Sequence, residues 1–498
     1  MASIAPRIGF NERLRDWREG FVLTERMKRL AAIAALLAFG ALWGAAVGLG
    51  GPATAIVAAT FIACAFVVRD FRVGVVLLIT IMPISQSYVF PHEMFGVTGI
   101  NPLNLVMATT LAALVMRTAG DGTLSHLTPK PLLFLYLIPA IFAGLIGAPH
   151  AADIPSIFRE EEMIYFTNGV GYLRDMLLKP MLFVVYALLV SVAVQRSHKP
   201  ERFVTPVVLS VWIMASVVLV FTAMAGVSLS DLAGEYSRHF FSALGMHAND
   251  LGRLYAVAYA LMLFVWDRTS HIGVKTVMFF AMGVVVGALL LTFSRGAFLG
   301  FILVNIVYLF SRRSTKTLLL AAVLVPVALV MMPGAVVDRV TFGFDGGAEA
   351  VSNGRVDEIW MPVIPELFRS PIWGNGLGAI MWSGPMQAGV LPNVAHPHNA
   401  YLEIILDLGF VGLFVVLAYW IVTFRDFRRL AHDQRLTPEL QGFFEGASAG
   451  LLAFLVAGFA GSSLLPAPEQ AFLWLAVGMM YGIRRKFAPR PAKKKRKF

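Results

Sequence analysis

Charged residues and cysteine are both scarce in this sequence. Only 14% of the 498 residues are charged, whereas 58% are hydrophobic. A soluble domain of this length cannot bury so much apolar surface, because soluble proteins are covered by polar and charged side chains. The single cysteine, Cys64, excludes an intramolecular disulfide. An internal repeat and a low-complexity linker are also missing, so we expect a single domain that lies in a lipid bilayer.

Long apolar runs take up most of the chain. A helix needs roughly 17–25 apolar residues to cross a bilayer, and in lipid every backbone polar group must be paired within the protein. We therefore expect an all-α integral membrane protein with about fourteen transmembrane helices, within a range of about twelve to fourteen. The predicted segments are 30–50, 53–68, 73–90, 101–116, 131–148, 176–194, 204–226, 251–266, 273–293, 297–311, 317–334, 400–424, 446–464 and 468–483. Several are short, which predicts two or three broken or re-entrant helices.

The net charge of +11 has the distribution of a membrane topology signal. When the N-terminus is placed in the cytoplasm and the segments alternate, all but nine of the 41 lysines and arginines fall on the cytoplasmic side. An even number of spans with both termini inside fits this pattern, and a nucleic-acid partner is excluded. We expect a multi-pass protein of the inner-membrane type, in contact with membrane lipids.

This topology divides the chain into five parts. Residues 1–29, with Phe10, Trp17 and Phe21 among arginines, predict an amphipathic arm at the cytoplasmic membrane surface. The basic tail 484–498 predicts a cytoplasmic anchor beside anionic lipids. Between them we expect helices 1–11 in 30–334, a long structured periplasmic loop in 335–399 and helices 12–14 in 400–483.

Nine basic residues remain on the outer side, where the topology rule does not explain them. They are Arg159, Arg174, Lys179, Arg238, Arg253, Arg295, Arg339, Arg355 and Arg369. Arg295 is the sharpest candidate because Ser294-Arg295-Gly296 forms a tight turn between two apolar runs. Its guanidinium is expected either to reach the headgroup region or to hold a phosphate in a bidentate manner.

The other arginines leave alternatives open. Arg174 and Lys179 are expected to pair with Asp175 or to reach a lipid headgroup. Arg238 precedes His247-Ala248-Asn249-Asp250, where Asn249 or Asp250 is expected to cap the next helix.

Arg355 stands in the predicted periplasmic loop, in Ser352-Asn353-Gly354-Arg355. It is expected either to face a cavity or to pair with Asp357 or Glu358.

The stretch His396-Pro397-His398-Asn399 ends the long loop and begins a predicted helix. Asn399 is a candidate N-cap, which places His398 beside the positive end of the helix and favours a neutral imidazole. A neutral imidazole is the form that a general base needs. Two other interpretations are loop packing and a His-x-His metal pair. No matching ligand set is visible in the outer segments, so we expect neither a metal nor another cofactor.

A neutral base and several arginines on one face suit group transfer from a diphosphate. The base removes the proton of an attacking hydroxyl, while guanidinium groups stabilise the charge that develops on the leaving phosphate. Glu403 and Asp407, four residues apart on one helix face, are expected to orient a histidine or to lie in the polar cavity.

These residues resemble the O-antigen ligase and O-antigen polymerase superfamily. The resemblance consists of His398-Asn399, nine residues, and then Gly409-Phe410-Val411-Gly412, together with the earlier turn Ser294-Arg295-Gly296. Gly354-Arg355, Trp360, Pro371, Gly374 and Gly376 are similar to the loop that precedes the family's histidine. The similarity covers about 235–425.

The resemblance implies a membrane glycosyltransferase (GT-C-like) fold and a polyprenyl (undecaprenyl) diphosphate-linked glycan donor. His398 would be the general base and Arg295 would bind the diphosphate. Arg174, Arg238 or Arg355 would be a second contact, with Lys179, His396 and Asn399 as further substrate-binding residues. The acceptor would be a lipid A–core sugar for a ligase, a second lipid-linked glycan for a polymerase, or a protein hydroxyl for a protein O-oligosaccharyltransferase.

A transporter or flippase is the rival class. It would need ionisable residues near mid-span at broken helices, and the apolar runs contain almost none.

Overall fold

A computed structural model gives the structure of residues 25–488, apart from short gaps. The gaps are 86, 89, 95–96, 120–126, 229–230, 233–239, 316–317, 320–321, 324–325, 327–332, 342–346 and 462. The predicted amphipathic arm and most of the basic tail therefore lie outside the described residues, as does most of segment 317–334. The chain forms two compact units, Met1–Ile62 and Ala63–Phe498.

The first unit contains most of helix α2 (Glu25–Arg69). Two of the predicted segments, 30–50 and 53–68, are the two arms of this helix. They meet at Gly51, whose φ of 74° and ψ of 179° interrupt the helical backbone. This backbone conformation is readily available only to glycine, so the kink follows from the sequence.

Helices form nearly all of the second unit, with one short antiparallel ladder between β1 (Glu93–Met94) and β2 (Val97–Thr98). The helices up to residue 312 are α3 (Phe71–Ile81), α4 (Pro102–Thr118), α5 (Lys130–Leu132), η2 (Leu133–Leu137), α6 (Ile138–Gly147), η3 (Ala148–Ala152), α7 (Ile157–Glu160), α8 (Gly169–Tyr172), η4 (Leu173–Leu178), α9 (Lys179–Arg196), η5 (Pro200–Phe203), α10 (Val204–Ala225), η6 (Phe241–Leu244), α13 (Ala248–Arg268), α14 (Ile272–Leu291) and α15 (Arg295–Arg312).

The described part of the segment that was predicted as a long structured loop contains seven short helices. They are α17 (Gly334–Thr341), α18 (Gly347–Ser352), η8 (Val356–Trp360), α19 (Met361–Val363), η9 (Ile364–Phe368), η10 (Ala379–Trp382) and α20 (Gly384–Gln387). The chain then forms α21 (Ala400–Ala431), α22 (Pro438–Ala457), η11 (Gly458–Ala460), η12 (Pro468–Gln470) and α23 (Ala471–Lys486).

Among the described residues, seven helices are long and apolar enough to cross a membrane. They span Lys130–Ala152, Gly169–Arg196, Pro200–Ala225, Ile272–Leu291, Arg295–Arg312, Ala400–Ala431 and Pro438–Ala460. Every predicted apolar segment except 317–334 contains a described helix. The chain is therefore an all-α membrane protein.

Among the described helical segments, three contain a widened π-helical turn, and in each case a proline follows shortly after it. The turns η2, η4 and η8 precede Pro139, Pro180 and Pro362. Proline cannot donate an N–H, and its ring clashes with the carbonyl four residues earlier. A widened turn accommodates that ring, so these three irregular turns have a cause in the sequence.

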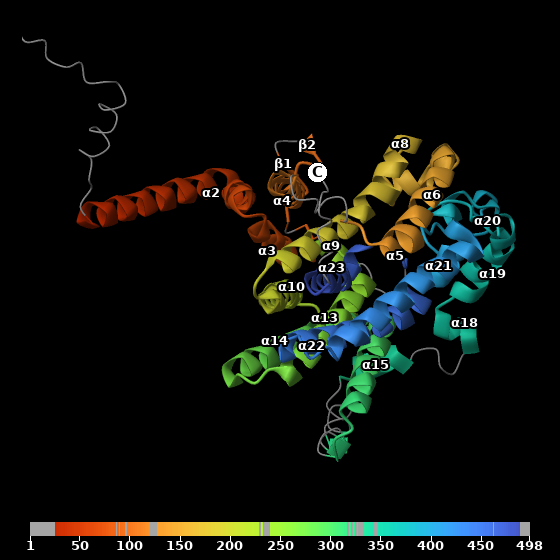
Figure 1. The fold of residues 1–498 in the computed structure, drawn as a ribbon. Helices are drawn as coiled ribbons and strands as arrows, with labels where there is room; N and C mark the ends of the chain where they lie inside the picture. The colour runs from red at the N-terminus through yellow and green to blue at the C-terminus, as the bar shows by residue number, and fades with distance from the viewer. Residues whose placement is uncertain are drawn as a thin grey trace, which may run out of the picture. The chain divides into compact units, whose positions relative to one another are not determined.

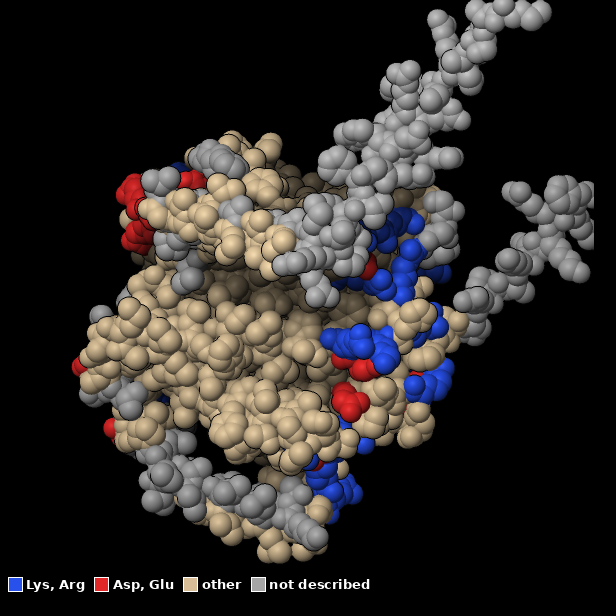
Figure 2. Space-filling view, turned by 90° about the vertical axis from the view of Figure 1, so that its left-hand side faces the viewer, with Lys and Arg blue, Asp and Glu red and all other residues tan. Residues whose placement is uncertain are grey.

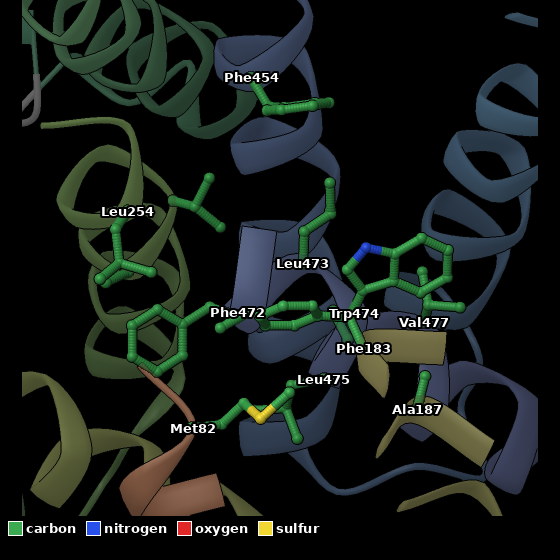
Figure 3. Packing of buried hydrophobic residues seen from close by; sticks show 14 of the residues in the cluster. Met82, Phe183, Ala187, Leu254, Phe454, Phe472, Leu473, Trp474, Leu475 and Val477 are labelled. Atoms are coloured by element: carbon green, nitrogen blue, oxygen red, sulfur yellow. The ribbon is translucent and has the colours of Figure 1, made fainter. Parts of the chain in front are cut away.

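Helix α23 lies in the centre of the core of the second unit. Residues 471–483 are all buried, which is expected when a helix is surrounded on every side. Figure 3 shows Phe472, Leu473 and Trp474 between side chains of α9, α13 and α22.

Helices α13 and α22 form the most extensive helix pair among the described elements. Gly442, Gly446 and Gly450 recur every four residues along α22 and face the backbone of α13, where a Cβ at Gly446 would lie 2.5 Å from the carbonyl oxygen of Ala260. Small residues at this spacing allow two helix backbones to approach closely. Figure 1 shows α21 alongside this pair.

Helices α13, α15 and α21 begin at one end of the second unit and finish at the other, and these two ends differ chemically. We call the end where α13, α15 and α21 begin the histidine end, and the end where they finish the arginine-rich end. Exposed Arg425, Arg429 and Arg435 lie at the latter. Figure 2 shows lysine and arginine side chains gathered along one side of the visible face.

Candidate active site

The two histidines before α21 lie against each other. Their ring centroids are 4.2 Å apart, and the backbone N–H of His398 donates to Nδ1 of His396 at 3.3 Å. Since that Nδ1 accepts a hydrogen bond, the neutral His396 ring carries its proton on Nε2. The pair is therefore built as one unit in which His396 supports the backbone of His398.

His398 has a left-handed backbone conformation, with φ of 54°. This conformation costs a non-glycine residue about 1–2 kcal/mol and persists where the surroundings impose it. Asn399 follows as the N-cap, and its Oδ1 accepts from the N–H groups of Tyr401 and Leu402 at 3.1 and 3.2 Å. The predicted cap is thus confirmed, and His398 lies directly before the start of α21.

The long loop fixes the same stretch from the other side. The indole N–H of Trp360 donates to the carbonyl oxygen of Pro397 at 2.8 Å. Trp360 ends the π-helical turn η8, which begins just after Arg355. The backbone of His398 is therefore held by its own neighbours and by a residue 38 positions earlier in the chain.

Helix α21 is interrupted at Gly409 (φ 75°), about three helical turns after His398. The interruption frees the carbonyl groups of Leu406 and Asp407, which accept from the N–H groups of Asn375 at 2.8 Å and Gly376 at 3.0 Å. After the break, the N–H of Phe410 donates to the carbonyl oxygen of Pro371 at 2.7 Å. The loop thus fills the gap in the helix.

Asp407 anchors the loop rather than a histidine. Its buried carboxylate accepts from the N–H groups of Gly378 and Ala379 at 3.0 and 3.1 Å. A Cβ at Gly374 would lie 2.2 Å from the carbonyl oxygen of Asp407, so only glycine permits this approach. The role that the structure shows for Asp407 is to hold the loop against α21.

Arg253, at the start of α13, is the most deeply buried basic residue of the histidine end among the described residues. Only 5% of its side chain is exposed, and its Nη2 donates to Asp250 Oδ1 at 2.6 Å and to Glu469 Oε1 at 3.1 Å. From the sequence alone, Arg253 is one of the nine basic residues on the predicted outer side and has no assigned role. The N-cap of α13 is His247, whose Nδ1 accepts from the N–H of Asn249, so the expectation that Asn249 or Asp250 caps this helix is wrong.

Glu403 links α21 to the chain before α23. Its Oε2 accepts from the N–H of Ser463 at 3.0 Å, and it interacts electrostatically with Arg253 and Glu469. The hydrogen bond described for Glu403 is thus to the chain before α23 and not to a histidine. Through it, the first turn of α21 lies beside the turn that leads to Glu469.

The electrostatic environment keeps His396 neutral. Burial lowers the pKa of its imidazole from 6.5 to about 4. The nearby groups Arg253, His247 and Arg355 act in the same direction. Arg355 and Arg253 therefore both belong to the surroundings of the histidine pair.

Arg295 is the first residue of α15, and the hydroxyl of Ser294 caps this helix by accepting from the N–H of Ala297. Its neighbour Gly296 faces the end of α22, because a Cβ at Gly296 would lie 3.8 Å from the carbonyl oxygen of Ala457. The next residue, Gly458, faces Tyr401 in the same way, at 3.5 Å. The end of α22 thus lies between the arginine turn and the start of α21.

The remaining predicted contacts have other partners in the structure or lie outside the described residues. Both Arg174 and Lys179 pair with Asp175, at 2.9 and 2.8 Å, and more than half of each side chain is exposed. Arg174 also lines a groove of about 710 Å³ between residues 145–149 and 168–174. Arg238 falls in the gap 233–239.

A metal site is not visible in the part of the chain that the structure describes. No group of three or more histidine, cysteine, aspartate or glutamate side chains has a metal-binding arrangement there. The two histidines face each other, and the nearby carboxylates are engaged by Arg253 and by backbone N–H groups.

Comparison with protein families finds a family model that matches the part of the chain containing most of this site. Residues 278–417 match the family model described as O-Antigen ligase. No curated protein matches the chain. The matched residues include Arg295, Arg355 and the stretch from His396 to Asn399, whereas Arg253 and Glu469 lie outside them.

Proposed function

We propose that this chain, a member of the O-antigen ligase and polymerase superfamily through residues 278–417, is a multi-pass inner-membrane glycosyltransferase. Its donor is a polyprenyl diphosphate-linked oligosaccharide, and its acceptor is a sugar hydroxyl at the periplasmic face. The observation that carries the proposal is the histidine pair, held in a fixed conformation at the start of α21 within the matched region.

In this mechanism His398 is the general base. Its imidazole takes the proton of the acceptor hydroxyl, whose oxygen attacks the anomeric carbon of the donor. The bond between that carbon and the diphosphate oxygen breaks, and polyprenyl diphosphate leaves with its electron pair. His396 and Asn399 support this step by fixing the backbone on either side of His398.

Arg295 binds the diphosphate in this proposal. It begins α15, and the N-terminus of a helix carries a partial positive charge that favours an anion. Arg355 contributes positive charge near the histidines. Arg174 and Lys179, which share Asp175 at the edge of the groove, are assigned to the acceptor or to a lipid headgroup. Arg238 is retained as a second diphosphate contact on the basis of its sequence position alone.

The proposed topology has about fourteen spans and both termini in the cytoplasm. The concentration of arginines at the end of the bundle opposite the histidines supports it. The histidine end is then periplasmic, where lipid-linked glycans are presented.

The rival class, a transporter or flippase, gains one feature from the structure, because α21 is broken beside a buried aspartate. Such breaks form ion sites in carriers. Here both carboxylate oxygens of Asp407 accept backbone N–H groups of the loop, and the loop fills the gap. The broken helix is therefore a structural joint, which favours the transferase.

The deciding experiment supplies purified protein in vesicles with a lipid-linked oligosaccharide and separates the products on a lipid gel. A product that forms only with added lipid A–core identifies a ligase. A ladder from the donor alone identifies a polymerase, and label on added protein identifies a protein O-oligosaccharyltransferase. Recovery of unchanged donor under all three conditions would contradict the proposed function.

A further inference from the structure

Glu469 is a buried acid that belongs to the histidine end but lies far from it in sequence. It stands in η12, only 3% of its side chain is exposed, and its Oε1 accepts from Arg253 Nη2 at 3.1 Å. The two residues are 216 positions apart. A buried guanidinium held by a buried carboxylate is fixed in position more firmly than an exposed pair, because water does not compete for it.

The backbone that carries Glu469 is itself rigidly held. Gln470 donates from Nε2 to the carbonyl oxygens of Ser463 and Leu465 at 3.1 and 2.6 Å, and its Oε1 accepts from the indole N–H of Trp474. The N–H of Ser463 donates to Glu403. The turn 463–470 is thus tied to α21 and to α23, so that Glu469 presents a fixed acceptor to Arg253.

Arg253 lies against the turn that also faces the start of α21, because Gly461 of this turn faces its guanidinium and Gly458 faces Tyr401 and Ala400. The groups that act on His396 are Arg253, His247 before α13 and Arg355 in the long loop. The acidic groups Asp250, Glu469 and Glu403 act in turn on Arg253. Asp250 also pairs with Arg253, but 37% of its side chain is exposed and water screens its charge. Glu469 is therefore the stronger counter-charge for Arg253.

We propose that Glu469 is a positioning residue that acts through Arg253. By holding the guanidinium at the start of α13, it fixes both the place and the net strength of the positive charge beside His396 and His398. Residues 253 and 469 both lie outside the family match, so this role does not follow from it. The link to catalysis rests on the proposed function, whereas the link to histidine titration does not.

Two single variants change the charge near the histidines in opposite directions. Glu469→Gln removes one of the two carboxylates that pair with Arg253, so that more of its positive charge is felt at the histidines. This disfavours the imidazolium and moves the acid limb of the kcat/KM profile to lower pH. Arg253→Gln removes the positive charge and moves this limb to higher pH. Each shift is expected to be about one pH unit, as for a unit charge close to a titrating group. Glu469→Asp keeps the charge and should restore the limb to its original position.

Glu445→Gln is the matched control. Glu445 is equally buried and also accepts from an arginine of α13, Arg268, but at the arginine-rich end. It should leave the acid limb unmoved. A merely structural role for Glu469 predicts reduced activity in both Glu469→Gln and Glu445→Gln with no movement of the limb, and that result would overturn the proposal.

A second readout does not depend on glycosyl transfer. Diethyl pyrocarbonate acylates only neutral imidazole, and mass spectrometry of the peptide with His396 and His398 gives the rate at each pH. The pH at which the acylation rate is half-maximal should fall in Glu469→Gln, rise in Arg253→Gln and stay the same in Glu445→Gln. If these pH midpoints move but neither the wild type nor any variant transfers a glycan, the proposed function fails and the positioning role stands. If transfer occurs and the midpoints do not move, the positioning role fails alone.

Discussion

The two ends of α13 carry the same pair of side chains in different surroundings. Arg253 pairs with Glu469 at the histidine end, and Arg268 pairs with Glu445 at the arginine-rich end. Glu445 also accepts from Arg312 of α15 at 3.0 Å, so that one carboxylate joins three helices.

The buried cluster around Glu445 is balanced in charge, because Arg312 also pairs with Asp267 at 2.7 Å and two arginines then face two carboxylates. The charge at the histidine end acts on the imidazole of His396. The comparison indicates that one buried ion pair fixes helices, whereas the other shapes the electrostatics of a site.

The largest expected effect of a substitution is at His398. Asparagine tolerates the left-handed backbone conformation, so His398→Asn removes the imidazole and keeps the fold. Loss of a general base should lower kcat by about 10²- to 10⁴-fold. His432→Asn, at the arginine-rich end, serves as the control, because that ring contacts only the exposed end of α21 in the described structure. Near-normal turnover by His398→Asn would remove it as the base.

A smaller effect is expected at the two ends of α15, where Arg295 is the first residue and Arg312 the last. Lysine is a point charge and cannot reproduce a bidentate guanidinium, so Arg295→Lys should reduce kcat/KM for the donor by about ten- to hundredfold. Arg312→Lys should reduce thermal stability and leave kcat/KM per folded molecule intact. Unaltered donor affinity and turnover in Arg295→Lys would instead indicate that this arginine only reaches the headgroup region.

Glu445→Gln tests the stabilising role of the arginine-rich end. The substitution removes the carboxylate from two arginines, while Arg312 keeps Asp267. The free energy of unfolding should fall by about 2–3 kcal/mol, somewhat less than for a buried pair with no other partner. The measurement is a denaturation curve in detergent, with transfer normalised to folded protein. A loss of normalised activity without a loss of stability would reverse the roles that we assign to the two ends.

The smallest effect concerns His396. Since its pKa is lowered to about 4, it is neutral throughout the usual assay range and should not define the acid limb. An asparagine side chain can also accept from the backbone N–H two residues later, which here belongs to His398. His396→Asn should therefore lower kcat only about two- to fivefold and leave the acid limb of the pH profile in place.

Stability gives an independent check on His396. The folded state binds fewer protons than the unfolded state between pH 6.5 and 4, so the wild type should lose stability as the pH falls through this range. His396→Asn should lose less over the same range. Equal losses in both proteins would place the titrating group elsewhere.

Local signals in the sequence predicted much of this molecule. Apolar runs gave the helices, Asn399 was identified as a cap, and the small residues around Arg295 indicated a turn. Arg253 and Glu469 could not be paired in advance, because nothing local indicates a contact across 216 positions. The choice of Asn249 or Asp250 as a cap failed because His247 takes that position.

The break in α21 is a feature for which a signal did exist. Gly409 stands within an apolar helix, where glycine weakens a helix and needs another reason. The loop residue that accepts from Phe410 after the break, Pro371, lies far earlier in the chain and could be found only from the fold. Asp407 was assigned to the histidines or to the cavity for the same reason, since its backbone partners lie in the loop.

The central claim is that the histidine end transfers a glycan from a lipid diphosphate. The most direct test measures, in proteoliposomes with a chelator present, both the glycan added to the acceptor and the polyprenyl diphosphate released. We predict one diphosphate released for each glycan transferred, in the wild type and not in His398→Asn. Movement of intact lipid-linked glycan across the bilayer, with no diphosphate released, would contradict this account.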